Sequence, residues 1–538
     1  MTWWGWGAPG HDAALPEHAL RFLAAEVGLA EQARGPVDLA AVRLRESALP
    51  AGVLQRLLAI CGADGARTDR EARVWHAAGK SYPDLVRQRT GDCAVAPDVV
   101  ALPRGDEQVR AVLECCAAAE LAVVPFGGGT SVVGGVEPLR GRFRAVVTLD
   151  LGRMDRVIEV DPKALVVGVE PGLRLPALEV ALAGHGLTLG HFPQSYEFAT
   201  VGGCAATRSA GQASTGYGRF EELVRGVRLA APAGELDARA VPATAAGPDL
   251  RALVVGSEGT LGVITGLSLS VRPRPPLTRH EGFVLPDFGS GVEALRALAQ
   301  ERAGPDVVRL SDEQETRASL ALAGEGGWLR RVGFAYVRAR GRAAGALLIC
   351  GWEGEENEAI GRRARSVAVL RRHDALSLGQ AAGAAWVRTR FHGPYLRDAL
   401  LARGVLVDTL ETATSWSRLE ALYDAVGVAL RGALDRRGTP PLVLCHVSHV
   451  YESGASLYFT FLARQEEGAE LEQWRAAKCA ASEAIMANGG TITHHHAVGT
   501  DHLPWMEAEV GSLGLDLIRA AKQTLDPVGV MNPGKLLP

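Results

Sequence analysis

The sequence predicts an α+β protein with more than one domain. At 538 residues the chain is too long for a single hydrophobic core. Between residues 95 and 276, strand-like and helical runs follow one another without a regular βαβ repeat, which disfavours a doubly wound fold. A proline-rich stretch at 272–276 is typical of a linker, and a second set of strands and helices follows it.

The first 94 residues are expected to form a helical extension. Apolar residues recur at helical spacing from Leu49 to Cys61, and no residue pattern in this part indicates chemistry. From Val99 the pattern changes to a strand at 99–102, a helix at 106–119 and a second strand at 121–124.

A loop with almost no large side chains follows the strand at 121–124. It consists of Pro125, Phe126, Gly127, Gly128, Gly129, Thr130 and Ser131. Glycine lets the backbone approach a ligand closely, and successive N–H groups with hydroxyls form a concave anion site. The string matches neither the P-loop nor the G-x-G-x-x-G pattern, and an ordinary tight turn is the alternative.

Two further glycine-rich loops lie downstream. One reads PQSYEFATVGGCAATRSAG over residues 193–211, and the other reads GSEGTLGVIT over 256–265 and continues into a strand. Three loops that expose their backbone exceed what turns alone require. They therefore indicate a large cofactor that carries phosphate groups.

These three strings resemble the FAD-contacting segments of the vanillyl-alcohol-oxidase type flavoproteins. The resemblance implies a PCMH-type FAD-binding domain with two α+β subdomains over residues 95–276, with the first loop on the pyrophosphate. Besides that loop, it implies cofactor contacts from Gln194, Ser195, Glu197, Thr200, Gly202, Gly203, Thr207, Arg208, Ser209, Glu258, Gly259, Gly262, Val263 and Ile264. Residues 125–135 contain no His or Cys and Cys204 is interpreted as a packing residue, so we expect non-covalent FAD.

Residues 277–505 are expected to form an α/β cap domain that covers the flavin. Strands are predicted at 280–285, 307–310 and 346–350, with helices at 291–300 and 357–371. The last segment, 506–538, is expected to return to the FAD domain.

The most unusual string of the chain is His494-His495-His496. On an extended segment His494 and His496 would share one face and His495 would lie on the other. Three imidazoles can move protons near neutral pH or bind a phosphate. A surface histidine run is one alternative. A metal site is another, although none is expected; it would need a further ligand, for which the candidates are His446, His449 and His502.

Tyr458 and Arg397 are further candidates. Around Tyr458, the apolar residues Leu457, Phe459 and Phe461 alternate with polar ones, so the tyrosine projects from the opposite face of a predicted strand. A half-exposed strand tyrosine is the plain alternative. For Arg397, in the string GPYLRD, the plain alternative is a helix arginine paired with a neighbour on the surface.

The second half of the chain resembles alkyldihydroxyacetonephosphate synthase and its bacterial relatives. The strings that carry the resemblance are FHGPYLRDALLARGVLVDTLETATSW, HVSHVYESGASLYFTF, GGTITHHHAVG and LDPVGVMNPGKLL. The resemblance implies that Tyr458 and His494 to His496 are catalytic and that Arg397 is an active-site arginine. It also implies an exchange of the acyl group of acyl-dihydroxyacetone phosphate for a fatty alcohol, without net redox change, in a homodimer.

An alternative function remains open on the same scaffold. Asp501 follows the histidines at a place where eukaryotic members of the family are expected to have basic residues. Relatives with such an ending include FAD-dependent oxidases or dehydrogenases of 2-hydroxy acids, such as D-lactate or glycolate. There an arginine would bind the carboxylate and a histidine would take the hydroxyl proton.

Composition excludes several other classes of protein. The net charge is −4, so nothing indicates a nucleic-acid partner. We expect a cytoplasmic protein, because neither a signal peptide nor a run of about 18 apolar residues is present. The eight cysteines lack CxxC spacing and are expected to be reduced. A peripheral membrane contact is left open by the lipid-like substrates.

Overall fold

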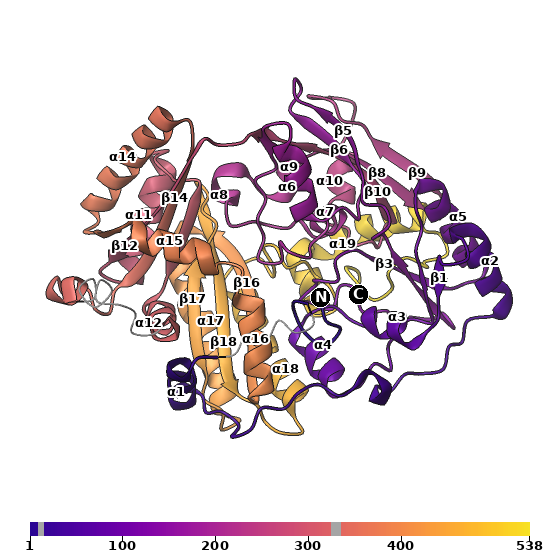
Figure 1. Cartoon of the computed structure of the whole chain (residues 1–538), viewed down its shortest axis with the longest axis horizontal. Coiled ribbons are helices and arrows are strands. Elements are labelled where there is room, and N and C mark those ends of the chain that lie inside the picture. The colour runs from indigo at the N-terminus through magenta and orange to yellow at the C-terminus, as the bar shows by residue number, and fades with distance from the viewer. Residues whose placement is uncertain (9–14, 324–334) are drawn as a thin grey trace.

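The computed structural model describes residues 1–8, 15–323 and 335–538, which fold around three main β-sheets. In Figure 1 the largest sheet and its helices form one side of the molecule, and the two smaller sheets form the other. Three hydrophobic clusters correspond to these sheets. The protein is therefore built from several packed layers rather than one core.

The first sheet has four strands in the order β1-β2-β4-β3. The elements up to this sheet are α1 (Glu17–Glu26), η1 (Leu39–Ala41), α2 (Ala51–Cys61), β1 (Ala66–Arg67), α3 (Arg70–Trp75), α4 (Tyr82–Arg89), β2 (Val99–Ala101), α5 (Asp106–Ala118), β3 (Ala122–Phe126) and β4 (Val146–Asp150). The first 94 residues thus include a strand, β1, that pairs with β2 and that the helical prediction missed. Two residues are too few to show a period of two.

The second sheet is antiparallel and has the order β5-β6-β10-β8-β9. Its elements are β5 (Val157–Asp161), β6 (Val166–Val169), α6 (Leu175–Ala183), β7 (Leu187–Thr188), α7 (Val201–Thr207), α8 (Ser214–Tyr217), α9 (Phe220–Leu223), β8 (Val224–Ala231), β9 (Gly234–Ala238), α10 (Leu250–Val254) and β10 (Val263–Ser270). One mixed sheet, with its β2-β4-β3 part parallel, and one antiparallel sheet give this part of the chain its α+β character, as predicted.

Part of the proline-rich stretch that the sequence predicts as a linker is paired with another strand. Residues Arg272–Pro273 form β11, which pairs with β7. The pairing tolerates a proline because it is short and lies at an edge, and the N–H of Arg274 supplies a hydrogen bond to the carbonyl of Gly186.

The third sheet has seven strands in the order β15-β12-β14-β13-β17-β18-β16, and all its pairs are antiparallel. Its elements are β12 (Leu277–Leu285), α11 (Phe288–Gln300), β13 (Val307–Ser311), α12 (Glu313–Leu322), β14 (Ala346–Gly354), α14 (Glu356–Arg372), β15 (Leu376–Gly379), α15 (Gln380–Thr389), α16 (Gly393–Ala402), β16 (Val405–Ser415), α17 (Trp416–Asp435), β17 (Leu442–Val447), β18 (Gly454–Arg464) and α18 (Glu470–Ala487). Helices α17 and α18 pack on each other and against β16 (Figure 1).

The last segment contains η2 (Leu503–Trp505) and α19 (Met506–Leu525) and then runs beside β3. The N–H of Val123 donates to the carbonyl of Val530, and the N–H of Asn532 donates to the carbonyl of Val123, both at 2.8 Å. The end of the chain is thereby held next to the strand that leads into the first glycine-rich loop. Within the described ranges, no helix has both the length and the apolar character needed to cross a bilayer.

Candidate active site

The three glycine-rich loops meet at the end of β3. A Cβ atom added to Gly128 would lie 2.1 Å from the carbonyl oxygen of Phe198, in the second loop. A Cβ at Gly259, in the third loop, would lie 2.8 Å from Cγ of Pro125. Segments that are far apart in the sequence therefore approach one another closely at these positions, which is possible because glycine has no side chain.

The first loop has the free donors that a phosphate needs. Among the described residues, the amides of Gly128, Gly129, Thr130 and Ser131 donate to no protein acceptor. The hydroxyl of Ser131 instead accepts the amide of Gly135 at 2.9 Å, which shapes the end of the loop. Since backbone N–H groups inside a protein are nearly always paired, these amides fit an anionic ligand such as the pyrophosphate of FAD.

Several predicted cofactor residues of the second loop are engaged by the protein itself. Thr200 caps α7 by accepting the amide of Gly203. Arg208, which is left-handed with φ 50°, donates its guanidinium to the carbonyls of Val255 and Ala252. Ser209 Oγ lies 3.1 Å from Nε2 of His191. These side chains therefore serve first to shape the loop.

The other residues of this set have different surroundings. Gln194 is exposed and Ser195 half-buried, Gly202 is packed against Pro171, and the hydroxyl of Thr207 donates to the carbonyl of Gly203. Val263 and Ile264 are core residues of β10. Glu197 accepts hydrogen bonds from Trp6 and Tyr395.

Glu258 connects the third loop to the segment that follows the histidines. Its carboxylate accepts the amides of Val498 and Gly499, each at 2.8 Å. Burial raises the pKa of Glu258 to about 7. The side chain that was predicted to contact FAD therefore holds two loops together, and it is half protonated near neutral pH.

Replacing Gly128 by alanine is expected to lower FAD affinity by at least about tenfold, equivalent to about 1.4 kcal/mol. The new methyl group would collide with the fixed carbonyl of Phe198 and displace the loop. Gly127→Ala should have a smaller effect, because its methyl group meets the side-chain oxygen of Thr200 rather than a backbone carbonyl. Flavin absorbance per protein after gel filtration measures the loss.

Gly361→Ala is the matched control, because no atom lies within 4 Å of the added Cβ. Circular dichroism shows whether each variant is folded. Full flavin content in folded Gly128→Ala would contradict the assignment of this loop.

Tyr458 lies on β18 between two other polar residues of neighbouring strands. In the sheet register it is opposite His446 on β17 and opposite Glu411 on β16. Its ring stacks on that of His446 with centroids 4.8 Å apart. Leu457, Phe459 and Phe461 are fully buried, and Phe459 stacks on Tyr423 of α17. The predicted alternation is confirmed, since the tyrosine projects from the face opposite to α17.

The histidine run is folded around one buried carboxylate. The amides of His494, His495 and His496 all donate to the carboxylate oxygens of Glu411, and the hydroxyl of Thr493 donates to it as well. The prediction of an extended segment with alternating faces is therefore wrong. The three amides turn toward one acceptor, and Nδ1 of His494 comes within 3.0 Å of Nδ1 of His495.

The histidine rings and Tyr458 form one cluster. The ring centroids of His495 and His496 lie 5.9 and 5.5 Å from that of Tyr458. On the other side, the hydroxyl of Tyr451 lies 2.5 Å from Nε2 of His494. The structure thus brings together the tyrosine and all three histidines that were predicted from the sequence.

Burial sets the protonation states in this cluster. It lowers the pKa of His495 to about 3 and that of His496 to about 4. It raises the pKa of Tyr458 to about 12. For Glu411, burial favours the neutral acid, but the histidine rings and the donated hydrogen bonds hold its pKa well below the usual value. At neutral pH the site therefore contains neutral imidazoles, a neutral phenol and one carboxylate.

Three neighbouring charged residues were not predicted. Glu315 accepts hydrogen bonds from Arg309 and from Nδ1 of His446, and His446 also contacts Arg309 at 3.0 Å. Arg219 donates to the carbonyl of His494 at 2.6 Å. Their strands and loops are far apart in sequence, so only the pairing of strands reveals them. Glu411 was not predicted either. Its only local signal in the sequence is that it is a carboxylate within the strand sequence DTLETAT.

Arg397 lies on α16, apart from this cluster. Its Nη1 donates to the carbonyl of Lys80 at 2.7 Å, and its buried Nε has no partner among the described residues. Among the residues that the structure describes, no contact joins Arg397 to Tyr458 or to the histidines. The unpaired Nε fits an anionic ligand, since a buried guanidinium N–H rarely stays unpaired.

One group of histidines has the composition of a metal site. Ligand nitrogens of His449, His494 and His495 lie within 4.8 Å of one another. Around a tetrahedral zinc ion such nitrogens are roughly 3.4 Å apart, as the Zn–N bond length requires. His449 is also held by Ser456 and by the carbonyl of Gly211.

Family comparisons support these assignments of fold and cofactor. The chain matches the FAD binding domain family over residues 97–237 and the C-terminal domain family of FAD-linked oxidases over residues 274–536. FAD is therefore the cofactor of this chain, in agreement with the three loops.

Curated relatives decide the family. The alkyldihydroxyacetonephosphate synthase of Dictyostelium discoideum is 34% identical over 483 residues, which cover 88% of this chain and 79% of the relative. The chain belongs to the alkyldihydroxyacetonephosphate synthase family. The corresponding enzyme of Trypanosoma brucei brucei is 33% identical over 495 residues, which cover 90% of this chain and 80% of the relative.

Solved structures agree with this membership. A structure of alkyldihydroxyacetonephosphate synthase superposes with a TM-score of 0.87 at 28% identity and covers 100% of this chain and 99% of its own. p-Cresol methylhydroxylase shares the PCMH-type fold. Its structure superposes with a TM-score of 0.66 at 16% identity and covers 91% of this chain and 98% of its own. The glycolate oxidase subunit GlcD of Bacillus subtilis is a more distant relative, with 25% identity over 82% of this chain and 89% of its own.

Proposed function

We propose that the protein is an FAD-dependent transferase of ether-lipid synthesis. It would exchange the acyl group of acyl-dihydroxyacetone phosphate for a fatty alcohol. The bond between C1 and the ester oxygen breaks, a fatty acid leaves, and a bond from C1 to the alcohol oxygen forms. One proton passes from the alcohol to the released carboxylate or to solvent, so no oxidant or reductant is needed.

The observation that carries this proposal is the buried cluster of one phenol with neutral imidazoles. The exchange requires that a proton be taken from the carbon beside the carbonyl and from the alcohol. His495 and His496 are unprotonated at neutral pH because of their lowered pKa values and can accept those protons. Tyr458 keeps its proton and can donate a hydrogen bond to a developing oxyanion. FAD, when bound, supplies an electrophilic ring system.

We assign cofactor binding to the backbone of the three loops, with FAD held non-covalently. Arg397 is the proposed partner of the substrate phosphate, because its buried Nε is free to donate. A charged Asp501 would repel the substrate phosphate. This repulsion is weakened because burial raises the pKa of Asp501 to about 7, so that part of it is neutral.

Further parts of the proposal concern organisation. We propose domains at 95–276 and 277–505, with 506–538 returning to the first, and a cytoplasmic location. The eight cysteines support that location because all of them are free thiols. A homodimer and a peripheral membrane contact are proposed from the family. Leu513 and Leu517 lie on α19 beyond its kink at Gly511 and are exposed apolar residues that are available for either.

The test combines a product assay with a flavin spectrum. Purified protein with acyl-dihydroxyacetone phosphate and a fatty alcohol should form the ether product and release fatty acid in equal amounts, with no lasting bleaching of the flavin band. Persistent bleaching by D-lactate or glycolate, without ether product, would replace this proposal by 2-hydroxy-acid oxidation. A protein that stays colourless after FAD is supplied would contradict both functions.

A further inference from the structure

We propose that residues 1–7 are a positioning element of the active site. Through Trp6 and Lys80 they fasten α16, and with it Arg397, to the first and second glycine-rich loops. The role of Arg397 in substrate binding rests on the proposed function, whereas the coupling of these segments does not.

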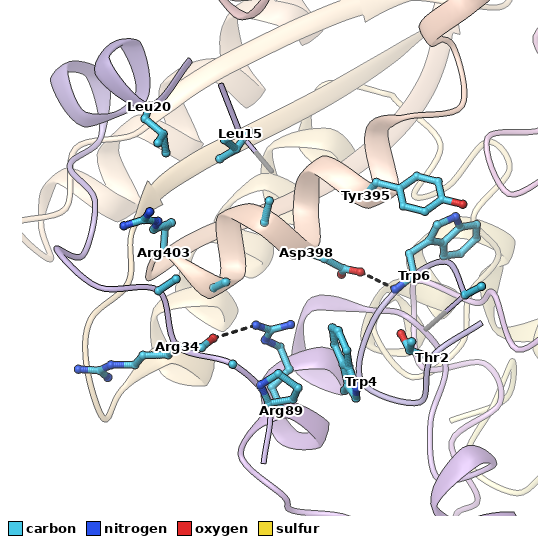
Figure 2. Close-up of a pocket in the computed structure, with 16 residues that line it drawn as sticks. Thr2, Trp4, Trp6, Leu15, Leu20, Arg34, Arg89, Tyr395, Asp398 and Arg403 are labelled. Atoms are coloured by element: carbon cyan, nitrogen blue, oxygen red, sulfur yellow. Dashed lines mark hydrogen bonds between the residues drawn. The ribbon is translucent and has the colours of Figure 1, made fainter. Parts of the chain in front are cut away.

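Trp6 joins α16 to the second loop. Figure 2 shows its backbone N–H directed at the carboxylate of Asp398, to which it donates a hydrogen bond. Its indole Nε1 donates to Oε2 of Glu197 at 3.3 Å, and its ring meets that of Phe198 edge-on at 5.2 Å. Tyr395 of α16 donates to the same oxygen of Glu197 at 2.9 Å. One carboxylate of the loop therefore holds both the N-terminal segment and α16.

Lys80 connects the same segment to the first loop and to Arg397. Its buried Nζ donates to the carbonyls of Thr2 and Trp3, at 3.1 and 3.0 Å. Its backbone N–H donates to the carbonyl of Ser131 at 2.6 Å, and its own carbonyl accepts Nη1 of Arg397. A buried amine that is paired only with carbonyl groups is costly to maintain. Such a group is expected where it fixes several segments at once.

The segment fits closely against α16. A Cβ atom at Gly5 would lie 2.5 Å from Oδ2 of Asp398, and one at Gly7, which has φ +80°, would lie 2.4 Å from Cε1 of Tyr395. The turn is closed by a hydrogen bond from the N–H of Thr2 to the carbonyl of Gly7 at 2.8 Å. The glycines thus permit a close approach that larger residues would prevent.

The other anchors of helix α16 lie toward its C-terminal end, where the carbonyls of Ala402 and Arg403 accept the amides of Arg34 and Ala30. Leu400 and Leu401 are its fully buried residues. A cavity of about 450 Å³ lies beside it (Figure 2). Its lining includes Trp4 of the N-terminal segment, Arg89 of α4 and Arg403 just after α16. Because packing does not fill this side of the helix, the polar contacts of Trp6 and Lys80 carry much of its attachment.

Hydrogen exchange and kinetics test the proposal together in the FAD-bound protein. Trp6→Ala keeps the backbone N–H that binds Asp398 but removes the indole and ring contacts that hold residues 1–7 on the second loop, and Lys80→Met removes the amine that binds Thr2 and Trp3. With the segment released, the amides of α16 should exchange at least tenfold faster in both variants, while those of α17 keep their protection. The KM for acyl-dihydroxyacetone phosphate should rise about tenfold with kcat changed less than threefold, because Tyr458 and the histidines lie elsewhere. Trp6→Phe, which keeps the ring contact with Phe198 but loses the indole donor, should lie between the wild type and Trp6→Ala.

Trp4→Phe is the matched control, since Trp4 lies in the same segment and its ring contacts Arg89 rather than Glu197 or Asp398. It should leave both α16 exchange and KM unchanged. Wild-type exchange of α16 in Trp6→Ala, or equally faster exchange in α17, would overturn the proposal. If neither the wild type nor any variant forms ether product, the proposed function fails. The exchange rates then still show whether residues 1–7 fasten α16.

Discussion

Replacing Tyr458 by phenylalanine is expected to lower ether formation by about 10²–10⁴-fold, the range typical of a lost general acid or base. The phenol of Tyr458 holds its proton throughout the neutral range, because burial raises its pKa to about 12. Phenylalanine keeps the ring that stacks on His446, so the sheet should retain its packing. Initial rates of ether product, measured at saturating substrate, give the change in kcat.

Tyr423→Phe provides the control. Tyr423 is another half-buried tyrosine, but it lies on helix α17, which packs on the opposite face of the sheet. Its hydroxyl donates to Asp312 at 3.0 Å. Its loss should cost about 1 kcal/mol of stability and little activity. Flavin content and melting temperature of Tyr458→Phe should match the wild type. Turnover near the wild-type value in that variant would remove Tyr458 from the catalytic site.

The sequence was most informative where chemistry depends on local strings. Three glycine-rich loops identified a phosphate-bearing cofactor because the lack of side chains is visible residue by residue. The alternation around Tyr458 gave the correct face of β18 for the same reason, since a strand has a period of two. Both predictions need only neighbouring residues.

The sequence was least informative where strands distant in the chain are paired. Glu411 is opposite Tyr458 only through the register of β16 and β18, and no local pattern fixes that register. The same pairing explains the error about the histidine run, whose conformation is set by a carboxylate 83 to 85 residues away. The N-terminal tryptophans showed no function in the sequence because their partners lie on α16 and in the second loop.

Replacing Glu411 by glutamine is expected to reduce both activity and stability. The carboxylate accepts four donors, and an amide nitrogen in place of one oxygen would face the N–H of His494 as a second donor. One unpaired buried N–H costs about 1–3 kcal/mol. The loss of negative charge also lowers the basicity of His495 and His496 further, because Glu411 raises their pKa values. We expect a fall in kcat of about 10²-fold.

The pH dependence separates this role of Glu411 from simple destabilisation. The pKa of Glu411 is lower in the folded protein than the value of about 4.3 expected for the unfolded chain. The ionised carboxylate therefore stabilises the fold fully above about pH 4.3. This stabilisation is lost as the pH falls toward the pKa of Glu411 in the folded protein. The difference in melting temperature between wild type and Glu411→Gln should therefore be largest near neutral pH and shrink below about pH 4. Glu281→Gln is the matched control, because Glu281 is equally buried in the same sheet but is paired with Arg279 and Arg363. Glu281→Gln should lose stability while keeping the wild-type pH profile of kcat. Equal activity losses in Glu281→Gln and Glu411→Gln would show that Glu411 acts only through the stability of the fold.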